Sequence, residues 1–283
     1  MPAPAAPFVT RAPRDVAGWA ALFEPLSLPV LGQTARAIAV LRDNEDAVDA
    51  HLLNDTVAAD PLLTLKLMAH VAGLRRSRDA DSRGDPETVT AALVMLGIGP
   101  FFSAFGDCPT VEQQLAGRPD ALEGFRAVLR RSHRAANFAL GFAVHRMDHD
   151  APVIHEAALL HDFAEMLLWL RAPELALAIA ARQAADPALR SACVQRELLN
   201  IELPDLQQAL MLAWRLPPLL VKISDDRHAD SDAVKNVLLA IRVARHSARG
   251  WDNAALPDDV RDVADLLRLG EGPARRLLDE LDS

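Results

Sequence analysis

Tyrosine is absent from the 283-residue sequence, and lysine occurs at only three positions, Lys66, Lys222 and Lys235, although there are 30 basic residues. Because alanine is abundant, we interpret this bias as genomic base composition rather than as a functional signal. Glycine is also scarce, with 13 residues, whereas alanine, leucine and arginine dominate. This composition favours helix.

Cysteine and long apolar runs are scarce as well. Cys108 and Cys193 lie far apart and show no metal-type spacing, so a reducing compartment is the simple interpretation. No apolar run approaches the roughly 18 residues of a membrane span. The N-terminus MPAPAAPFVTRAPRD has prolines where a signal peptide would need an apolar helix. We therefore expect a cytoplasmic protein without a membrane partner.

Several chemical signatures are also missing. The sequence has no glycine-rich phosphate loop, no GxSxG elbow and no CxxC pair. The net charge of -9 disfavours nucleic acid as a partner, because phosphate binding draws its energy from clustered cations. A local cluster of cations at Arg75, Arg76 and Arg78 is a possible exception, because it could contact phosphate groups. We expect no nucleic-acid partner.

Helical periodicity covers most of the chain, and apolar alternation at period two never persists, so we predict an all-α fold. Hydrophobic residues at 51% and charged residues at 24% are typical of a soluble globular protein. A polar surface loop is expected over 75–86. Helices are predicted near 19–23, 27–43, 48–59, 60–73, 88–96, 100–105, 125–143, 151–170, 173–184, 190–200, 204–214, 216–224, 233–248 and as two short helices around 270–272.

One stretch, AALLHDFAEMLLWL at 157–170, places the adjacent pair His161 and Asp162 within an apolar helical run. On a 3.6-residue repeat His161 shares a face with Ala157, Leu160 and Leu168, and Asp162 lies about 100° further round. We therefore expect the pair at the edge of the core. Two such residues bind a metal only if another helix supplies further ligands.

This pair, the upstream segment SHRAANFAL and the earlier segment LPVLGQTARAIAVLRDNED resemble the HDOD family of bacterial signalling proteins, relatives of the HD metal phosphohydrolases. The resemblance runs from about Pro25 to about Gly250. It implies a multi-helix bundle of two closely packed helical lobes with an HD-like helical core in the second lobe. We accordingly expect a loose segment at 1–14, an N-terminal lobe at 15–120, an HD-like lobe at 121–250 and C-terminal helices at 251–283.

The resemblance also implies a metal site with four positions. His133 matches the first histidine, and His161 and Asp162 match the pair. The final aspartate would fall near Arg245, and a cation there would repel a metal. Active relatives often have HDxGK, whereas this chain has HDFAE, so that Glu165 replaces a phosphate-facing lysine. The GYP signature of cyclic-dinucleotide hydrolases is absent.

Two interpretations of these positions stay open. In the one that we favour, His161 and Asp162 form a hydrogen-bonded pair where three helices meet, with Arg131, Arg134 or Arg245 as counter-charge. His133 is then a satisfied histidine at the core edge, and no residue is catalytic, metal-binding or cofactor-binding. The other interpretation is a metal-dependent phosphohydrolase acting on a nucleotide or cyclic nucleotide. A further acidic and histidine-rich group between His145 and Glu156 is expected to be solvated.

The segment GIGPFFSAFGDCP at 97–109 holds three phenylalanines within five residues. On a helix Phe101 and Phe105 lie at i, i+4, and Phe102 points about 100° away. Phe102 either packs under the following loop or forms an interaction surface at a lobe boundary or on an exposed patch.

From these features we expect a non-enzymatic regulatory protein that binds other signalling proteins. The partner, the input signal and the formation of a homodimer stay open.

Overall fold

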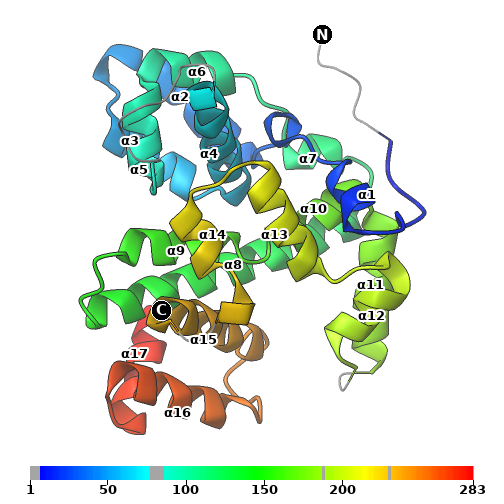
Figure 1. Ribbon diagram of the computed structural model, residues 1–283, viewed down its shortest axis with the longest axis vertical. Helices are drawn as coiled ribbons and strands as arrows, with labels where there is room; N and C mark the ends of the chain where they lie inside the picture. Colours follow the sequence, from blue (N-terminus) through cyan, green and yellow to red (C-terminus); the bar gives the residue numbers. More distant parts are fainter. Residues whose placement is uncertain (1–6, 77–85, 187–188, 229–230, 283) are drawn as a thin grey trace. The chain divides into compact units, whose positions relative to one another are not determined.

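The computed structural model describes residues 7–76, 86–186, 189–228 and 231–282 (Figure 1). Every regular element in these ranges is a helix, and the only β-type pairings there are two isolated bridges, Val30 with Thr110 and Ala248 with Gly250. The predicted all-α fold is confirmed. No helix within the described ranges combines the length and the apolar character needed to cross a membrane.

The chain forms two compact units that interleave in sequence. Unit 1 contains residues 1–127 and 163–217, and unit 2 contains residues 128–162 and 218–283. One division falls inside helix α8, and another falls directly after Asp162. The four linear segments expected from the sequence stay a prediction.

Unit 1 is built from helices, several of which begin after a side-chain cap, at Asp15, Asp49, Thr88 and Thr110. Its elements are α1 (Val16–Ala20), η1 (Pro25–Ser27), α2 (Gly32–Arg42), η2 (Glu45–Ala47), α3 (Ala50–Ala58), α4 (Pro61–Arg76), α5 (Val89–Leu96), α6 (Ile98–Phe105), α7 (Val111–Gln114), the start of α8 (Pro119–His145), α10 (Phe163–Arg171), α11 (Pro173–Ala185), α12 (Ser191–Leu199) and α13 (Leu203–Ala213).

The Asp60-Pro61 sequence begins α4 as predicted. Oδ1 of Asp60 accepts hydrogen bonds from the backbone N–H groups of Leu62 and Leu63 at 2.9 and 3.1 Å. Oδ2 accepts from the N–H of Leu31 at 2.7 Å, just before α2. The carboxylate is fully buried. Burial raises the pKa of Asp60 although these hydrogen bonds act in the opposite direction. One side chain therefore caps α4 and ties it to α2.

The N-terminal segment differs from the expectation of a loose tail. The N–H of Val9 donates to the carbonyl of Arg171 at 2.8 Å, and the guanidinium of Arg118 lies 4.3 Å from the ring centroid of Phe8. The carbonyl of Pro13 accepts from Asn200 at 3.0 Å. Residues 8–13 are therefore anchored on unit 1, because apolar and backbone partners outweigh the proline-rich composition. Residues 1–6 and most of the predicted loop at 75–86 lie outside the described residues.

Unit 2 surrounds the C-terminal two thirds of α8. Its further elements are α9 (Ala151–Leu160), α14 (Pro218–Ile223), η3 (Asp226–His228), α15 (Asp232–His246), α16 (Leu256–Leu267) and α17 (Glu271–Leu281). Helix α15 contacts α9, α14 and α16, and α16 contacts α17. The core includes Phe138, Phe142, Val237 and Val263. Gly141 of α8 leaves room for Leu281 of α17, because a Cβ at that position would meet Leu281 Cδ1 at 2.4 Å.

Candidate functional site

His161 and Asp162 lie at a break between helices. The sequence predicted one helix across this stretch, but α9 ends at Leu160 and α10 begins at Phe163. His161 keeps helical dihedral angles, and its N–H bonds the carbonyl of Ala158 three residues back. Both side chains are 8% exposed, so Asp162 lies inside the core rather than at its edge. Periodicity could not predict this break, because the contacts of the pair come from distant segments.

Two arginines hold the carboxylate of Asp162. Nε and Nη2 of Arg131 on α8 donate to Oδ2, each at 2.7 Å, and Nη2 of Arg245 on α15 donates to Oδ1 at 2.7 Å. Burial alone would raise the pKa of Asp162, but the charges of Arg245 and Arg131 and the hydrogen bond from His161 lower it well below its usual value. Asp162 is therefore an ionised carboxylate at neutral pH.

Both ring nitrogens of His161 face carboxylates. Nδ1 lies 3.1 Å from Oδ1 of Asp162, and Nε2 lies 3.0 Å from Oδ1 of Asp226 in η3. Burial would lower the pKa of His161, but the hydrogen bonds to Asp162 and Asp226 and their negative charges outweigh it and raise the pKa to about 9. At neutral pH the ring is an imidazolium that donates both of its N–H groups.

This arrangement does not fit a metal ion. A histidine ligand must offer a nitrogen lone pair, and an imidazolium with two donated N–H groups has none. A metal at Asp162 would compete with two guanidinium groups, which already supply positive charge to that carboxylate. Within the described ranges no group of three or more His, Cys, Asp or Glu side chains is arranged to hold a metal ion. The charges of Asp162 and His161 are stabilised instead by protein groups, namely Arg131, Arg245 and Asp226.

The expected counter-charges are found at two of the three proposed positions. Arg131 and Arg245 contact Asp162, whereas Arg134 donates to both oxygens of Asp282, at 2.7 and 2.8 Å, and to Oγ of Ser247 at 2.8 Å. Arg134 therefore ties the end of α17 to α8 and to the end of α15 within unit 2. One turn of α8 separates Arg131 from Arg134, and sequence alone could not assign their partners.

His133 lies on α8, two residues after Arg131. On α9, burial lowers the pKa of His155, and the proximity of His133 lowers it further. Asp226 was missed by the sequence analysis. The sequence hint for Asp226 is the acidic run at 224–232. Because that run was expected in a loop, helical periodicity could not predict which residue Asp226 contacts.

The group between residues 145 and 156 is only partly solvated. His145, His149 and Asp150 are exposed as expected. Glu156, however, is 5% exposed, because it lies on the inner face of α9. Asp148 accepts a hydrogen bond from Nε of Arg146 at 3.1 Å. The histidines and carboxylates of this segment are thus distributed between the core and the surface.

Phe102 is buried, with 5% of its surface exposed. Its ring packs edge-on against Phe101, with centroids 5.6 Å apart, and Phe101 also contacts Phe105 at 5.2 Å. This burial favours the packing alternative for Phe102 over a place on an exposed patch. The ring of Phe102, one residue after Phe101, can be buried here because α6 contacts α5 and also packs on α4, where the ring centroid of His70 lies 5.4 Å from that of Phe105.

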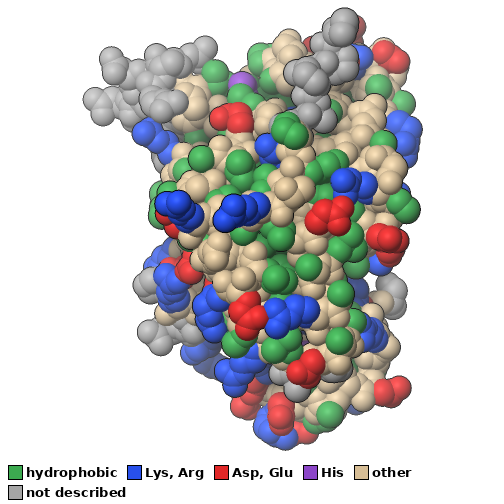
Figure 2. Space-filling view, turned by 90° about the vertical axis from the view of Figure 1, so that its right-hand side faces the viewer, with side chains coloured by type: hydrophobic (Ala, Val, Ile, Leu, Met, Phe, Trp, Pro, Cys, Tyr) green, Lys and Arg blue, Asp and Glu red, His purple; other side chains and the backbone are tan. Residues whose placement is uncertain are grey.

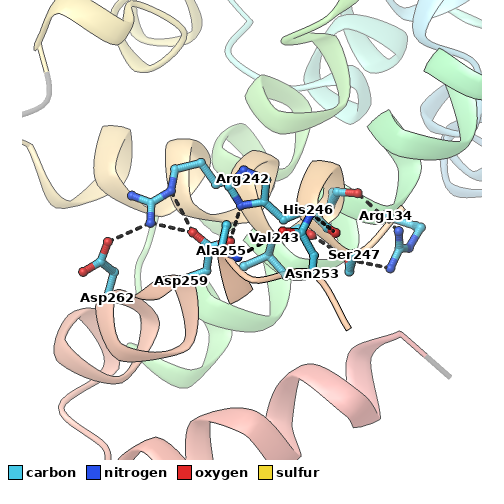
Figure 3. A network of polar contacts seen from close by, with 10 residues as sticks. Arg134, Arg242, Val243, His246, Ser247, Asn253, Ala255, Asp259 and Asp262 are labelled. Atoms are coloured by element: carbon cyan, nitrogen blue, oxygen red, sulfur yellow. Dashed lines mark hydrogen bonds and ion pairs between the residues drawn. The ribbon is translucent and has the colours of Figure 1, made fainter. Parts of the chain in front are cut away.

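A second polar network joins α15 to α16 (Figure 3). Asp259 is 1% exposed, and its Oδ1 accepts from Nε and Nη2 of Arg242 at 3.0 and 2.6 Å. Oδ2 lies 2.5 Å from Nδ1 of His246. Nη2 of Arg242 also donates to Asp262 at 2.8 Å. The network fastens the C-terminal helices to α15.

Comparison with known proteins adds two findings. The family model described as HDOD domain matches residues 28–229. No curated protein matches the sequence.

Two solved structures share the fold. The MmoQ response regulator from Methylococcus capsulatus str. Bath is 19% identical, with a TM-score of 0.66 over 89% of this chain and 98% of that chain. A virulence factor from Campylobacter jejuni subsp. jejuni is 16% identical, with a TM-score of 0.58 over 90% of this chain and 88% of that chain. At these identities the similarity shows the fold alone.

Proposed function

This chain belongs to the HDOD family, and on that premise we propose that it is a non-enzymatic regulatory protein that acts by binding other signalling proteins. The MmoQ structure, which shares the fold, is described as a response regulator. That description supports a place in signal transduction for the present chain.

One observation carries the non-catalytic part of the proposal. His161 and Asp162 are engaged with each other and with Arg131, Arg245 and Asp226, at distances of 2.7 to 3.3 Å. A catalytic metal site needs free ligand atoms and an open coordination position for water. Here a guanidinium takes the place where the resemblance implies the final aspartate. The alternative is a metal-dependent HD-type phosphohydrolase. It would require that Arg131 and Arg245 move away from Asp162, and that His161 lose a proton.

An exposed apolar row at the end of α8, called the α8 row, supports the binding part. Leu140 and Val144 are 37% and 62% exposed and lie at i, i+4 on one face of α8, and Met147, 84% exposed, lies in the turn directly after the helix with φ 58°. Exposed apolar side chains that gather on one face are typical of protein contacts. On the face of the molecule drawn in Figure 2, basic, acidic and apolar side chains are interspersed. We propose that the α8 row contacts a signalling partner.

The test is capture of partners from the native cell extract by the tagged chain. Val144→Glu and Met147→Glu place a charge on the row, and Val40→Glu is the matched control, because Val40 is 64% exposed on α2 in unit 1. We expect the wild type and Val40→Glu to capture the same protein and the two α8 variants to lose it. Equal capture by all four proteins would exclude the row. Metal-dependent hydrolysis of a nucleotide by the purified chain would exclude the non-enzymatic function.

A further inference from the structure

A cleft of about 790 Å³ lies in unit 2 between the end of α8, α15 and α16. This volume is within the range of small-molecule sites, roughly 300 to 1,000 Å³. The lining residues are His145, Arg146, Asp232, Lys235, Leu238, Leu239, Arg242, Asp262, Asp265, Leu266, Leu267 and Arg268. None of them belongs to the His161-Asp162 network, so the cleft is a separate feature of the molecule.

Cations outnumber carboxylates in this cleft although the whole chain carries a net charge of -9. Two of the four cations have carboxylate partners. Nη2 of Arg146 donates to Asp232 at 2.8 Å, and Nη2 of Arg242 donates to Asp262 at 2.8 Å. Figure 3 shows that Asp259 holds Arg242 from its other side.

The other two cations, Lys235 and Arg268, are exposed. Their side chains make no hydrogen bond or ion pair within the described part of the chain, and they act on Asp232 only through their charge. Asp232 begins α15 and has a side chain that is 60% exposed. Asp232 is thus near three cations, Arg146, Lys235 and Arg268, of which Arg146 has a second carboxylate partner in Asp148 at 3.1 Å. Lys235 and Arg268 are the two lining cations that remain available to an anionic ligand.

The end of α16 explains how Arg268 comes to the cleft. Arg268 is the C-cap of α16 with φ 56° and ψ 41°, in the left-handed region. Left-handed residues are common at helix ends, and Met147, Asn200 and Arg215 of this chain also have positive φ. An arginine at this position places a cation at the rim of the cleft. Capping alone does not require that cation.

The floor of the cleft is apolar. Leu239 and Leu267 are buried, and Leu238 and Leu266 are half-buried. A ligand that fits this lining has an anionic group for the cations and an apolar body for the leucines. Guanidinium and ammonium donors from several directions match the several oxygens and the double charge of a phosphate.

We propose that this cleft binds a small organic phosphate, with the phosphate held by Arg146, Lys235 and Arg268 and the apolar part of the ligand on Leu238 and Leu266. Asp232 competes with the phosphate for the same cations. The site would give the protein a small-molecule input beside the α8 row, because the lining residues His145 and Arg146 lie between Val144 and Met147 in the sequence.

Isothermal titration of the full chain at low salt tests the proposal, with phenyl phosphate as the probe. Inorganic phosphate lacks the apolar body, phenol lacks the charge, and benzoate carries a carboxylate. Phenyl phosphate is expected to bind most tightly, inorganic phosphate and benzoate more weakly, and phenol not at all. If benzoate or phenol binds as well as phenyl phosphate, the proposed ligand class is wrong.

Four variants identify the site. Lys235→Gln and Arg268→Gly are expected to weaken phenyl phosphate binding about tenfold, the effect of losing one charge-assisted hydrogen bond. Arg268→Gly should also raise the melting temperature, because glycine adopts the left-handed backbone without cost. A binding loss in a stabilised protein cannot be attributed to misfolding. Asp232→Asn should tighten binding, because it removes the competing carboxylate.

Arg126→Gln is the matched control, since Arg126 is an exposed cation on the unit 1 part of α8 and does not line the cleft. It should bind the probe as the wild type does. The proposal is overturned if neither the wild type nor Asp232→Asn binds phenyl phosphate at millimolar concentration. It is equally overturned if Lys235→Gln and Arg268→Gly retain wild-type affinity.

Discussion

At Asp162 a single carboxylate meets two guanidinium groups and an imidazolium inside the core. A buried charge is costly unless it is paired and hydrogen-bonded, and here every oxygen of Asp162 has a charged donor. Arg245 stands where the family resemblance implies a metal-binding aspartate. We propose that the positive charge of this residue makes the pair part of a structural ion network rather than a metal-binding group.

Removing the carboxylate should therefore be costly. Asp162→Asn leaves Arg131 and Arg245 without their shared carboxylate and His161 with Asp226 alone, and we expect a loss of roughly 3 to 5 kcal/mol in the free energy of unfolding. Urea denaturation measures this loss. Asp226→Asn is the control, because the Asp226 side chain is 39% exposed and contacts only His161 in this network. If the free energy of unfolding falls less in Asp162→Asn than in Asp226→Asn, Asp162 is not the main stabilising carboxylate of the network.

The charge of His161 predicts a pH dependence. Its pKa rises from 6.5 to about 9 on folding, so the stabilisation is fully present below about pH 6.5 and disappears as the pH rises through about 9. At one pKa unit per about 1.4 kcal/mol, the effect is roughly 3 kcal/mol. The stability difference between the wild type and His161→Gln should be larger at about pH 6 than at about pH 10. A difference that is constant with pH would contradict an imidazolium at this position.

At the scale of helices, local signals predicted some boundaries but not the partners. The helices predicted at 60–73 and 88–96 begin close to α4 and α5, because Asp60 and Thr88 are caps that bond N–H groups two or three residues away. The long helix α8 begins at Pro119, six residues before the predicted start. The break at His161 and Asp162 was missed, because Asp226 and Arg245 are 65 and 83 residues distant from the residues they contact. The burial of Phe102 likewise depends on neighbours that periodicity does not include.

Asp259 should control how firmly α16 and α17 are held. Asp259→Ala removes the acceptor shared by Arg242 and His246, and we expect a loss of roughly 1 to 3 kcal/mol. Hydrogen exchange should accelerate over 256–281 while α9 stays protected. Asp279→Ala is the control, since its pair with Arg275 is on the surface. Unchanged exchange in Asp259→Ala would show that apolar packing alone holds these helices.

The aromatic helix α6 gives a prediction on packing. Phe101 and Phe105 are 0% and 1% exposed, and Phe102 is 5% exposed. Because all three rings are buried, Phe102→Ala and Phe105→Ala should each cost roughly 3 to 5 kcal/mol in thermal or chemical denaturation. If Phe102→Ala keeps full stability and instead weakens self-association or partner capture, Phe102 belongs to an interaction surface.

For the whole molecule, the all-α fold and the HDOD family were predictable, because helical periodicity and the segments around the His-Asp pair are encoded locally. The interleaving of the two compact units was not, since it depends on which distant helices share a core. The proposed regulatory function rests on an ion network that closes only in the folded chain. Its partner surface on α8 and the phosphate cleft are separate from that network.

Metal analysis of the purified chain tests the central claim most directly. The protein is incubated with Mn²⁺, Fe²⁺ or Zn²⁺, desalted and measured by inductively coupled plasma mass spectrometry, with His161→Ala in parallel. Because Arg131, Arg245 and Asp226 occupy the ligand atoms of the pair, we predict far less than one metal ion per chain and equal values for both proteins. One metal ion per wild-type chain that is lost in His161→Ala would contradict the account.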